Sequence, residues 1–344
     1  MKAIVKTEPA PGAILCEVAA PEIRRSDEVR IRPILTSICG TDYHVYTWDA
    51  WSAGRVRPPR IMGHEFVGEV MEVGSDIRHL RVGDLVSGES HRVCGVCMQC
   101  RTGQGHVCAN TLILGVDTEG CFAEQVVVPA ASLWKNPPGM PLKLACIQDP
   151  LGNAVHAVLS GDVAGRSVLV LGCGPIGAMS VAVARACGAA TIIGTDTRDY
   201  RLDLARKLGA DVTVNVTRED AEAVVERVVP GGVDVALEMS GAPSAIRSAF
   251  RATRRGGRVA LMGIPSQTVE LDVAEELVMK GLDVHCIVGR RLYQTWATMS
   301  ALLASGRLNV APVITHELPW SEFAAGMNLM GQGECGKVIL HMQS

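Results

Sequence analysis

Residues 167–177 read SVLVLGCGPIG, and this stretch decides the fold of the second half of the chain. Its apolar start predicts a buried strand, and the apolar segment that follows it predicts a helix that ends near Cys187. Gly172 permits the tight turn between strand and helix, Gly174 lets the backbone approach a pyrophosphate, and Gly177 allows the helix to pack closely on the strand. A glycine triplet alone can mark only a tight turn, but here the strand and the helix are both in place.

The next predicted strand ends on Asp196, at the offset expected for a carboxylate that accepts hydrogen bonds from the adenosine ribose hydroxyls. The stretch therefore indicates a dinucleotide site, with the helix N-terminus facing the phosphates. An acidic residue at this position repels a 2′-phosphate and favours NAD. Arg198 leaves NADP open, because an arginine just there can accommodate that phosphate.

Outward from this stretch, six strand candidates alternate with segments of helical period and predict a doubly wound parallel sheet. The strand candidates are SVLVLG, TIIGTD, VTVNV, VDVALEM, GRVALMG and DVHCIVG. Before them, short apolar strands separated by glycine, proline and aspartate turns predict a mainly β domain. After residue 289 the chain is too short for another domain, and we expect it to return to the first one. The predicted domains are 1–152 with 290–344, and 153–289.

Composition excludes several classes of function. The 344 residues include 33 basic and 36 acidic ones, and the formal charge of −3 gives no extended field to attract a nucleic acid or an anionic membrane. No segment is long and apolar enough to span a bilayer, and the first residues do not resemble a secretory signal. A small-molecule enzyme of the cytoplasm is expected.

Four of the twelve cysteines lie within one loop, at Cys94, Cys97, Cys100 and Cys108. Four thiolates suit tetrahedral zinc, and a site closed by four protein ligands folds its loop instead of doing chemistry. Disulfides and an iron-sulfur cluster are the alternatives. We rank zinc first, because a reducing compartment disfavours disulfides and the NAD-binding fold needs no electron relay.

A second set of metal-binding residue types is spread more widely, at Cys39, His64 and Glu65. Each one alone would more often be a buried thiol, a hydrogen-bonded histidine or a surface charge. Beside glycines, and with a cofactor that accepts hydride, they indicate a zinc site with three protein ligands and one open position. An alcohol held there would lose its proton more readily.

The pattern Gly63-His64-Glu65-x2-Gly68-x5-Gly74-x2-Ile77 resembles the signature of the zinc-containing medium-chain alcohol dehydrogenase family. This resemblance implies a mainly β, GroES-like catalytic domain, a Rossmann domain, one catalytic and one structural zinc per subunit, and a homotetramer. It also implies that Thr41 and His44 form a proton relay. The implied NAD contacts are Ile176, Asp196, Arg201, Met262, Gly263, Ile264, Ile287 and Val288.

One position departs from the alcohol dehydrogenase pattern. Relatives of that type have a third zinc cysteine near the start of the nucleotide half, whereas this chain has Asp149. Either Glu65 binds the zinc while Asp149 assists the proton relay, or Asp149 binds the zinc and Glu65 contacts a zinc ligand without touching the ion. We favour the first account, which the resemblance implies.

Three further segments, ICGTDYHVYTWDAWS, DPLGNAVHA and LEMSGAP, resemble the branch of the family that oxidises the side-chain alcohol of L-threonine. This similarity implies oxidation by NAD to 2-amino-3-oxobutanoate. The alternative within enzymes is a polyol or 2,3-butanediol dehydrogenase with the same zinc and NAD. A non-catalytic relative is a third possibility, because folds often outlive functions.

Overall fold

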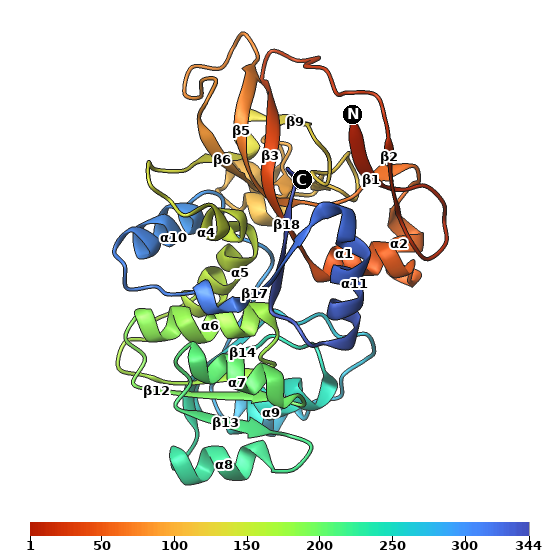
Figure 1. Ribbon diagram of the computed structural model, residues 1–344. Coiled ribbons are helices and arrows are strands. Elements are labelled where there is room, and N and C mark those ends of the chain that lie inside the picture. Colours follow the sequence, from red (N-terminus) through yellow and green to blue (C-terminus); the bar gives the residue numbers. More distant parts are fainter. Residues whose placement is uncertain (344) are drawn as a thin grey trace. The chain divides into compact units, whose positions relative to one another are not determined.

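The chain was studied as a computed structural model that describes residues 1–343 (Figure 1). It divides into two compact units, one made of residues 1–150 with the residues from 314 onward, and one made of Leu151–Val313. Within the described residues, no helix combines the length and the apolar character needed to cross a bilayer.

The first unit is mainly β, as predicted. Its largest sheet has the order β10-β6-β5-β3-β18-β17, and β9 pairs with β3 beside this path. Strands β3, β5 and β18 are antiparallel neighbours at its centre. The strands of this sheet are β3 (Glu28–Ile38), β5 (Glu65–Val73), β6 (Leu85–Gly88), β9 (Val126–Pro129), β10 (Leu133–Lys135), β17 (Ile314–Pro319) and β18 (Lys337–His341).

Smaller elements surround this sheet. A three-stranded sheet has the order β2-β1-β4, and β7 pairs with β8. These strands are β1 (Lys2–Lys6), β2 (Ile14–Glu17), β4 (Arg60–Ile61), β7 (His91–Arg92) and β8 (Leu112–Ile113). The helices and helical turns are α1 (Gly40–Thr47), α2 (Ala50–Arg55), α3 (Met98–Arg101), η1 (Gly105–Val107), η2 (Ala130–Ser132), α4 (Leu142–Cys146), η5 (Trp320–Glu322) and α11 (Phe323–Gln332).

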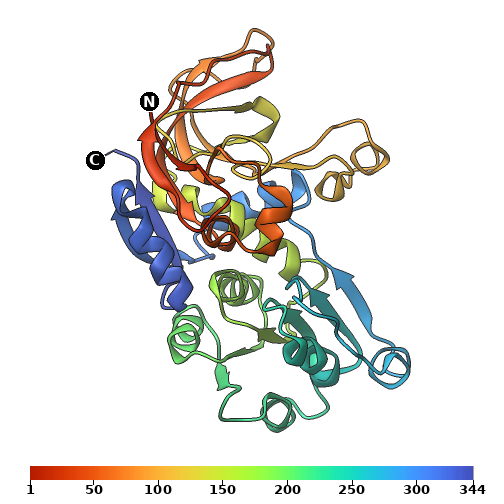
Figure 2. The same ribbon diagram turned by 90° about the vertical axis from the view of Figure 1, so that its right-hand side faces the viewer.

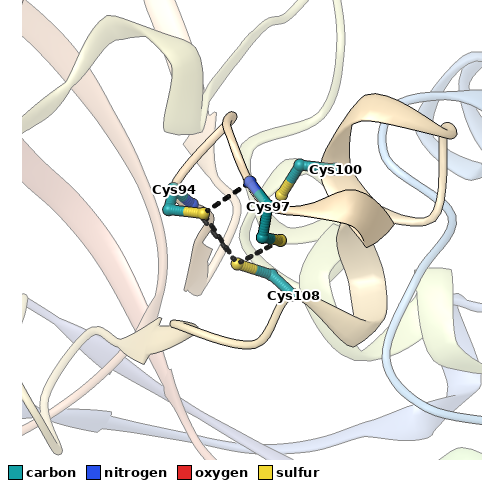
Figure 3. Close-up of side chains that lie close together, drawn as sticks. All are labelled: Cys94, Cys97, Cys100 and Cys108. Atoms are coloured by element: carbon teal, nitrogen blue, oxygen red, sulfur yellow. Dashed lines mark hydrogen bonds between the residues drawn. The ribbon is translucent and has the colours of Figure 1, made fainter.

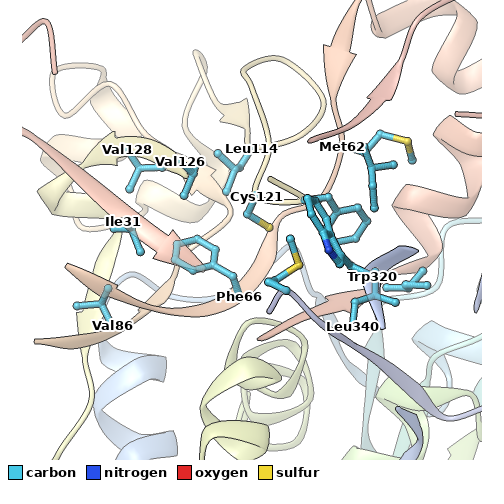
Figure 4. Packing of buried hydrophobic residues seen from close by; sticks show 14 of the residues in the cluster. Ile31, Met62, Phe66, Val86, Leu114, Cys121, Val126, Val128, Trp320 and Leu340 are labelled. Carbon is cyan, nitrogen blue, oxygen red and sulfur yellow. The ribbon is translucent and has the colours of Figure 1, made fainter. Parts of the chain in front are cut away.

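A continuous apolar core fills the first unit. Figure 4 shows Phe66 of β5 in this core with Ile31 of β3, Val86 of β6 and Leu340 of β18. Buried side chains alternate with less buried ones along the first part of β3, as expected for a strand that packs one face on a core. The last four residues of β3 are all buried, and Leu35 among them packs in a second apolar cluster with Ala145 and Cys146 of α4.

The second unit is a doubly wound parallel sheet, as predicted. Its order is β13-β12-β11-β14-β15-β16, and every neighbouring pair is parallel. The strands coincide with the six predicted segments: β11 (Ser167–Leu171), β12 (Thr191–Asp196), β13 (Val212–Asn215), β14 (Val233–Glu238), β15 (Thr253–Leu261) and β16 (Asp283–Cys286). The strand order reverses between β11 and β14, the place where this fold binds its ligands.

Helices cover both faces of this parallel sheet (Figure 2). α6 (Pro175–Ala186) packs with α7 (Asp199–Lys207), and α8 (Ala221–Val228) packs with α9 (Pro243–Ala252). The pairs lie on opposite faces because successive crossovers run in opposite directions from the switch point. The remaining elements are α5 (Gln148–Val158), which begins in the first unit, the π-helical η3 (Val273–Val278), α10 (Gln294–Ala304) and η4 (Ala311–Val313).

The boundary at which the chain leaves the second unit, between Val313 and Ile314, differs from the predicted domain boundary at residue 290. We expected residues 290–313 to return to the mainly β domain, but the compact second unit continues to Val313. Arg290 Nη1 donates to Asn153 Oδ1 at 2.9 Å, and the ring of His156 lies 2.9 Å from the carbonyl of Gly289. Trp296 of α10 is fully buried. These contacts hold the segment on the second unit, and periodicity alone does not indicate them.

Candidate functional site

The four-cysteine loop between β7 and β8 brings its sulfurs together (Figure 3). The sulfurs of Cys94, Cys97, Cys100 and Cys108 all lie within 4.8 Å of one another, and none of the four forms a disulfide. Cys108 Sγ is 3.5 Å from Cys94 Sγ and 3.8 Å from Cys97 Sγ. Zinc–sulfur bonds of about 2.3 Å in a tetrahedron place sulfurs about 3.8 Å apart, so the loop has the dimensions of a zinc site.

Backbone amides of the same loop favour the thiolate form. The amides of Cys97 and Asn110 donate to Cys94 Sγ and Cys108 Sγ at 3.4 and 3.3 Å. Hydrogen bonds from the amides of Val96 and Cys97 lower the pKa of the Cys94 thiol to about 6. Desolvation and the neighbouring sulfurs raise the pKa of Cys100 to about 12. The four thiols therefore differ in pKa. A bound cation would displace the protons that remain on them.

Pairing between β3 and β5 brings Cys39, His64 and Glu65 together. Ser37 lies opposite Glu65 in the register, so the residues just after β3 face those just before β5. Ligand atoms of the three residues lie within 4.8 Å of one another, and His64 and Glu65 are buried. Gly63, with φ +90°, makes the turn into β5, and a Cβ there would lie 2.1 Å from the ring of Phe122.

The carboxylate of Glu65 is held on one side only. Lys337 Nζ lies 2.5 Å from Glu65 Oε2, and the hydroxyl of Ser37 donates to the same oxygen. Lys337 Nζ also donates to the carbonyl of Ile38 at 2.7 Å. Burial lowers the pKa of Lys337, but the negative charge of Glu65 raises that pKa by more than burial lowers it. The pKa of Lys337 therefore lies above its ordinary value. Among the described residues, Glu65 Oε1 is buried and has no hydrogen-bond partner, as expected of an oxygen reserved for a metal.

Asp42 lies beside His64 as an ion-pair partner. Its carboxylate accepts from the amide of Cys39 at 2.9 Å, and Oδ1 lies 3.3 Å from His64 Nδ1. Burial lowers the pKa of His64, but the negative charges of Asp42 and Cys39 raise it well above its usual range. Surroundings that favour an imidazolium also favour a metal cation, and a carboxylate behind one nitrogen leaves the other available as a ligand. Sequence reasoning missed Ser37, Asp42 and Lys337.

The three residues predicted to move protons occupy different positions. Thr41 Oγ1 is 3.9 Å from Cys39 Sγ, which places it beside the candidate metal ligands. The side chain of His44 is 55% exposed, and its Nδ1 lies 2.6 Å from Asp49 Oδ2. Asp149 is buried and accepts a hydrogen bond from the amide of Ser90 at 2.9 Å. Within residues 1–343, the clustered ligand atoms do not include those of Asp149.

The glycine motif in the second unit leaves room for a ligand at one position. A Cβ on Gly177 would lie 1.9 Å from the carbonyl oxygen of Gly172, so only glycine fits in this turn of α6. Gly172 itself has φ +90°. A Cβ on Gly174 would meet nothing within 4 Å. The second glycine therefore faces open space, as required if a pyrophosphate approaches the backbone there.

A cavity of about 350 Å³ opens beside this turn, at the carboxyl ends of β11 and β12. Asp196 accepts from the amides of Cys173 and Arg198 at 2.9 and 3.0 Å, and Arg201 Nη1 lies 3.7 Å from its Oδ2. The lining residues that the sequence did not single out include Thr195, Thr197, Val216, Glu219, Ser240 and Ser244. Their position at strand ends is the signal that could have found them.

The remaining predicted cofactor residues follow the ends of the next strands. Met262, Gly263 and Ile264 come directly after β15, and Ile287 and Val288 come directly after β16. In a parallel sheet, the ends of these strands lie on the same edge as those of β11 and β12. Ile264 is 91% exposed and Val288 is 49% exposed. A Cβ on Gly263 would lie 2.0 Å from the amide nitrogen of Gly241, so the turn requires glycine.

Comparison with known proteins identifies two family domains along the chain. Residues 25–138 match the alcohol dehydrogenase GroES-like domain, and residues 175–305 match the zinc-binding dehydrogenase domain. An L-threonine 3-dehydrogenase from Bacillus licheniformis is 51% identical over 99% of this chain and 98% of its own. Another from Caldanaerobacter subterraneus subsp. tengcongensis is 48% identical over 99% of each chain. The solved structure of alcohol dehydrogenase TADH from Thermus sp. ATN1 matches with a TM-score of 0.91 and 32% identity, over 99% of both chains.

Proposed function

Since the chain belongs to the zinc-containing medium-chain alcohol dehydrogenases, we propose that it oxidises the secondary alcohol of L-threonine with NAD and releases 2-amino-3-oxobutanoate. The observation that best supports this reaction is the buried group of Cys39, His64 and Glu65, in which Glu65 Oε1 is unpartnered. The choice of L-threonine rests on the relatives that are 51% and 48% identical over nearly their whole length.

Two zinc ions per chain fit the donor groups. Cys39, His64 and Glu65 would hold the catalytic ion, and the thiolates of the loop Cys94–Cys108 would hold the structural one. NAD would occupy the second unit, with its pyrophosphate at Gly174 and its adenosine ribose on Asp196. The other contacts would come from Gly172, Ile176, Gly177, Arg201, Met262, Gly263, Ile264, Ile287 and Val288.

The chain's own residues would position the substrate and remove its proton. When bound, zinc supplies positive charge that makes an alcohol proton easier to lose, and NAD accepts the hydride. Thr41, beside Cys39, would accept the hydroxyl proton and pass its own to His44. His44 would release the proton to water, since its side chain is 55% exposed. Asp149 would assist this relay from its buried position.

The assignment of Glu65 as a zinc ligand, with Asp149 in the relay, has a direct test. Asp149→Asn should keep both zinc ions and lose kcat, because the amide keeps the side chain's size but removes its charge. Zinc content is measured by atomic absorption, and kcat by NADH absorbance. Loss of one zinc per chain would mean that Asp149 is the ligand instead.

The substrate assignment is tested by NADH formation with L-threonine, sorbitol and 2,3-butanediol, before and after chelation and return of zinc. We expect the highest kcat/KM with L-threonine and NAD, and recovery of activity with zinc. A higher kcat/KM with either polyol, or with NADP, would contradict that part of the proposal. No NADH from any alcohol, in protein that contains two zinc ions, would indicate a non-catalytic relative.

We also propose that the enzyme works in the cytoplasm as a homotetramer. The free thiols of the zinc loop suit a reducing compartment. Tetramers are expected from the family resemblance, and light scattering after size-exclusion chromatography measures the mass directly. A mass close to 36.5 kDa would identify a monomer instead.

A further inference from the structure

A sharp turn after α1 brings Asp49 back onto His44. Trp48 has the left-handed conformation φ 59°, ψ 51°, and it alone among the non-glycine residues of 1–343 has a positive φ. The turn places Asp49 Oδ2 at 2.6 Å from His44 Nδ1. The other oxygen, Oδ1, accepts from the amide of Ser52 at 2.9 Å and caps α2.

Helix capping accounts for only one of the two carboxylate oxygens. An N-cap aspartate needs a single oxygen to satisfy the first amides of its helix. Oδ1 of Asp49 does this, and the buried hydroxyl of Ser52 also donates to it at 2.8 Å. Oδ2 is therefore left for His44. Desolvation raises the pKa of Asp49, but hydrogen bonds from Ser52 and His44 lower that pKa by more than desolvation raises it. The carboxyl group is therefore an anion.

Two buried side chains hold this turn in place. The hydroxyl oxygen of Ser52 also lies 2.8 Å from the carbonyl oxygen of His44, so its single proton is shared between this carbonyl and Asp49 Oδ1. Lys6 is fully buried, and its Nζ donates to the carbonyls of Gly12 and Tyr46 at 2.9 and 3.3 Å. The same ammonium lies 5.0 Å from the centre of the Trp48 ring. Lys6 thus contacts the strained Trp48 itself and Ser52 contacts the residues His44 and Asp49 on either side of it, as expected at a functional position.

We propose that Asp49 is a positioning residue for proton transfer, which keeps the proton of neutral His44 on Nδ1 and leaves Nε2 as the accepting atom. This inference rests on the proposed function, in which Thr41 passes a proton to His44. Nε2 takes that proton, so both ring nitrogens are protonated while Nδ1–H still donates to Asp49. Water then takes the proton from Nε2, and the neutral ring is restored with the same tautomer.

The variant that tests this role is Asp49→Asn. An asparagine can still accept from the amide of Ser52, so α2 keeps its cap. Its amide group would donate to His44 Nδ1 and force the proton onto Nε2, the wrong tautomer for accepting a proton. We expect kcat to fall roughly tenfold to a hundredfold. KM and zinc content should stay unchanged, and added imidazole should partly restore kcat by accepting the proton directly.

A matched control is Asp272→Asn. Asp272 caps η3 by accepting from the amide of Glu275 at 3.1 Å, and no histidine contacts it in the described chain. It should leave kcat unchanged. His44→Asn and the double variant Asp49→Asn/His44→Asn complete a cycle, in which the double variant should be no slower than His44→Asn alone. An additional loss in the double variant, or an unchanged kcat in Asp49→Asn, would overturn the proposal.

Nitrogen-15 NMR of histidine-labelled protein tests the tautomer without any substrate. His44, assigned by its absence in His44→Asn, should carry its proton on Nδ1 in the wild type and on Nε2 in Asp49→Asn. A wild-type ring protonated on Nε2 would refute the role of Asp49. A failure of the proposed function gives a different result from a failure of this inference. The wild type would then give no NADH with L-threonine, or His44→Asn would keep full activity. In both cases the proton of His44 would still be found on Nδ1 in the wild type.

Discussion

Substitution of Lys337 by methionine tests whether Glu65 binds zinc. Lys337 is 3% exposed and Glu65 is fully buried, with 2.5 Å between Nζ and Oε2. Removing one partner of a buried ion pair leaves an uncompensated charge and costs about 3–5 kcal/mol. We therefore expect zinc-free Lys337→Met to lose about this much in its free energy of unfolding, because methionine fills the space without replacing the charge.

The loss should be smaller in the zinc-loaded protein. If Glu65 ligates zinc, the ion compensates the carboxylate, and the remaining loss is that of the Ile38 carbonyl, which lost its donor at 2.7 Å. An unsatisfied buried carbonyl costs about 1–3 kcal/mol. Urea unfolding followed by tryptophan fluorescence measures both losses in the first unit. Four of the five tryptophans lie there, namely Trp48, Trp51, Trp134 and Trp320.

Lys6→Met is the matched control, since Lys6 is also fully buried but donates only to backbone carbonyls. Its loss should be the same with and without zinc. Atomic absorption confirms the metal content of each sample. If Lys337→Met lost as much stability with zinc as without it, Glu65 would not be a ligand, and the assignment of the catalytic site would be wrong.

Three further substitutions separate folding from binding and test an ion pair. Gly174→Ala, whose Cβ meets nothing within 4 Å, should leave the melting temperature unchanged but weaken NADH binding by about tenfold or more in a fluorescence titration. Gly177→Ala places a Cβ 1.9 Å from a carbonyl oxygen and should itself cost about 1–3 kcal/mol of stability; equal melting temperatures would refute this reading. Desolvation raises the pKa of Asp117, but hydrogen bonds from Arg55 and the amide of Ile113 hold it below its ordinary value. The ionised carboxylate therefore stabilises the fold fully above its unfolded-state pKa, and this contribution is lost as the pH falls through the lower folded-state value. Asp117→Asn should cost about 1 kcal/mol at pH 7, since Arg55 is 36% exposed and screened, and progressively less as the pH falls below the ordinary pKa of an aspartate. A difference in urea midpoint that is independent of pH would contradict this.

Local features were readable from the sequence. The strands of the second unit are short apolar runs bounded by turns, and all six lie where the sequence predicted them. The glycines of residues 172–177 and the cysteines of residues 94–108 are equally local, because each set works within one turn or one loop. In such cases the spacing along the chain already determines the spacing in space.

Register and burial decided what the sequence alone did not. Lys337 reaches Glu65 only because β18 pairs with β3, and no pattern near either residue predicts that contact across 272 positions. Residues 290–313 remain with the second unit through contacts to Asn153 and His156, although their helical period fits either unit. Asp49 is only five residues from His44, yet their contact depends on the left-handed Trp48, which buried Lys6 holds in place. The sequence by itself determined the class of fold and the types of residue available for chemistry. Tertiary pairing determined which charges face one another, because a charge is tuned by its neighbours in space.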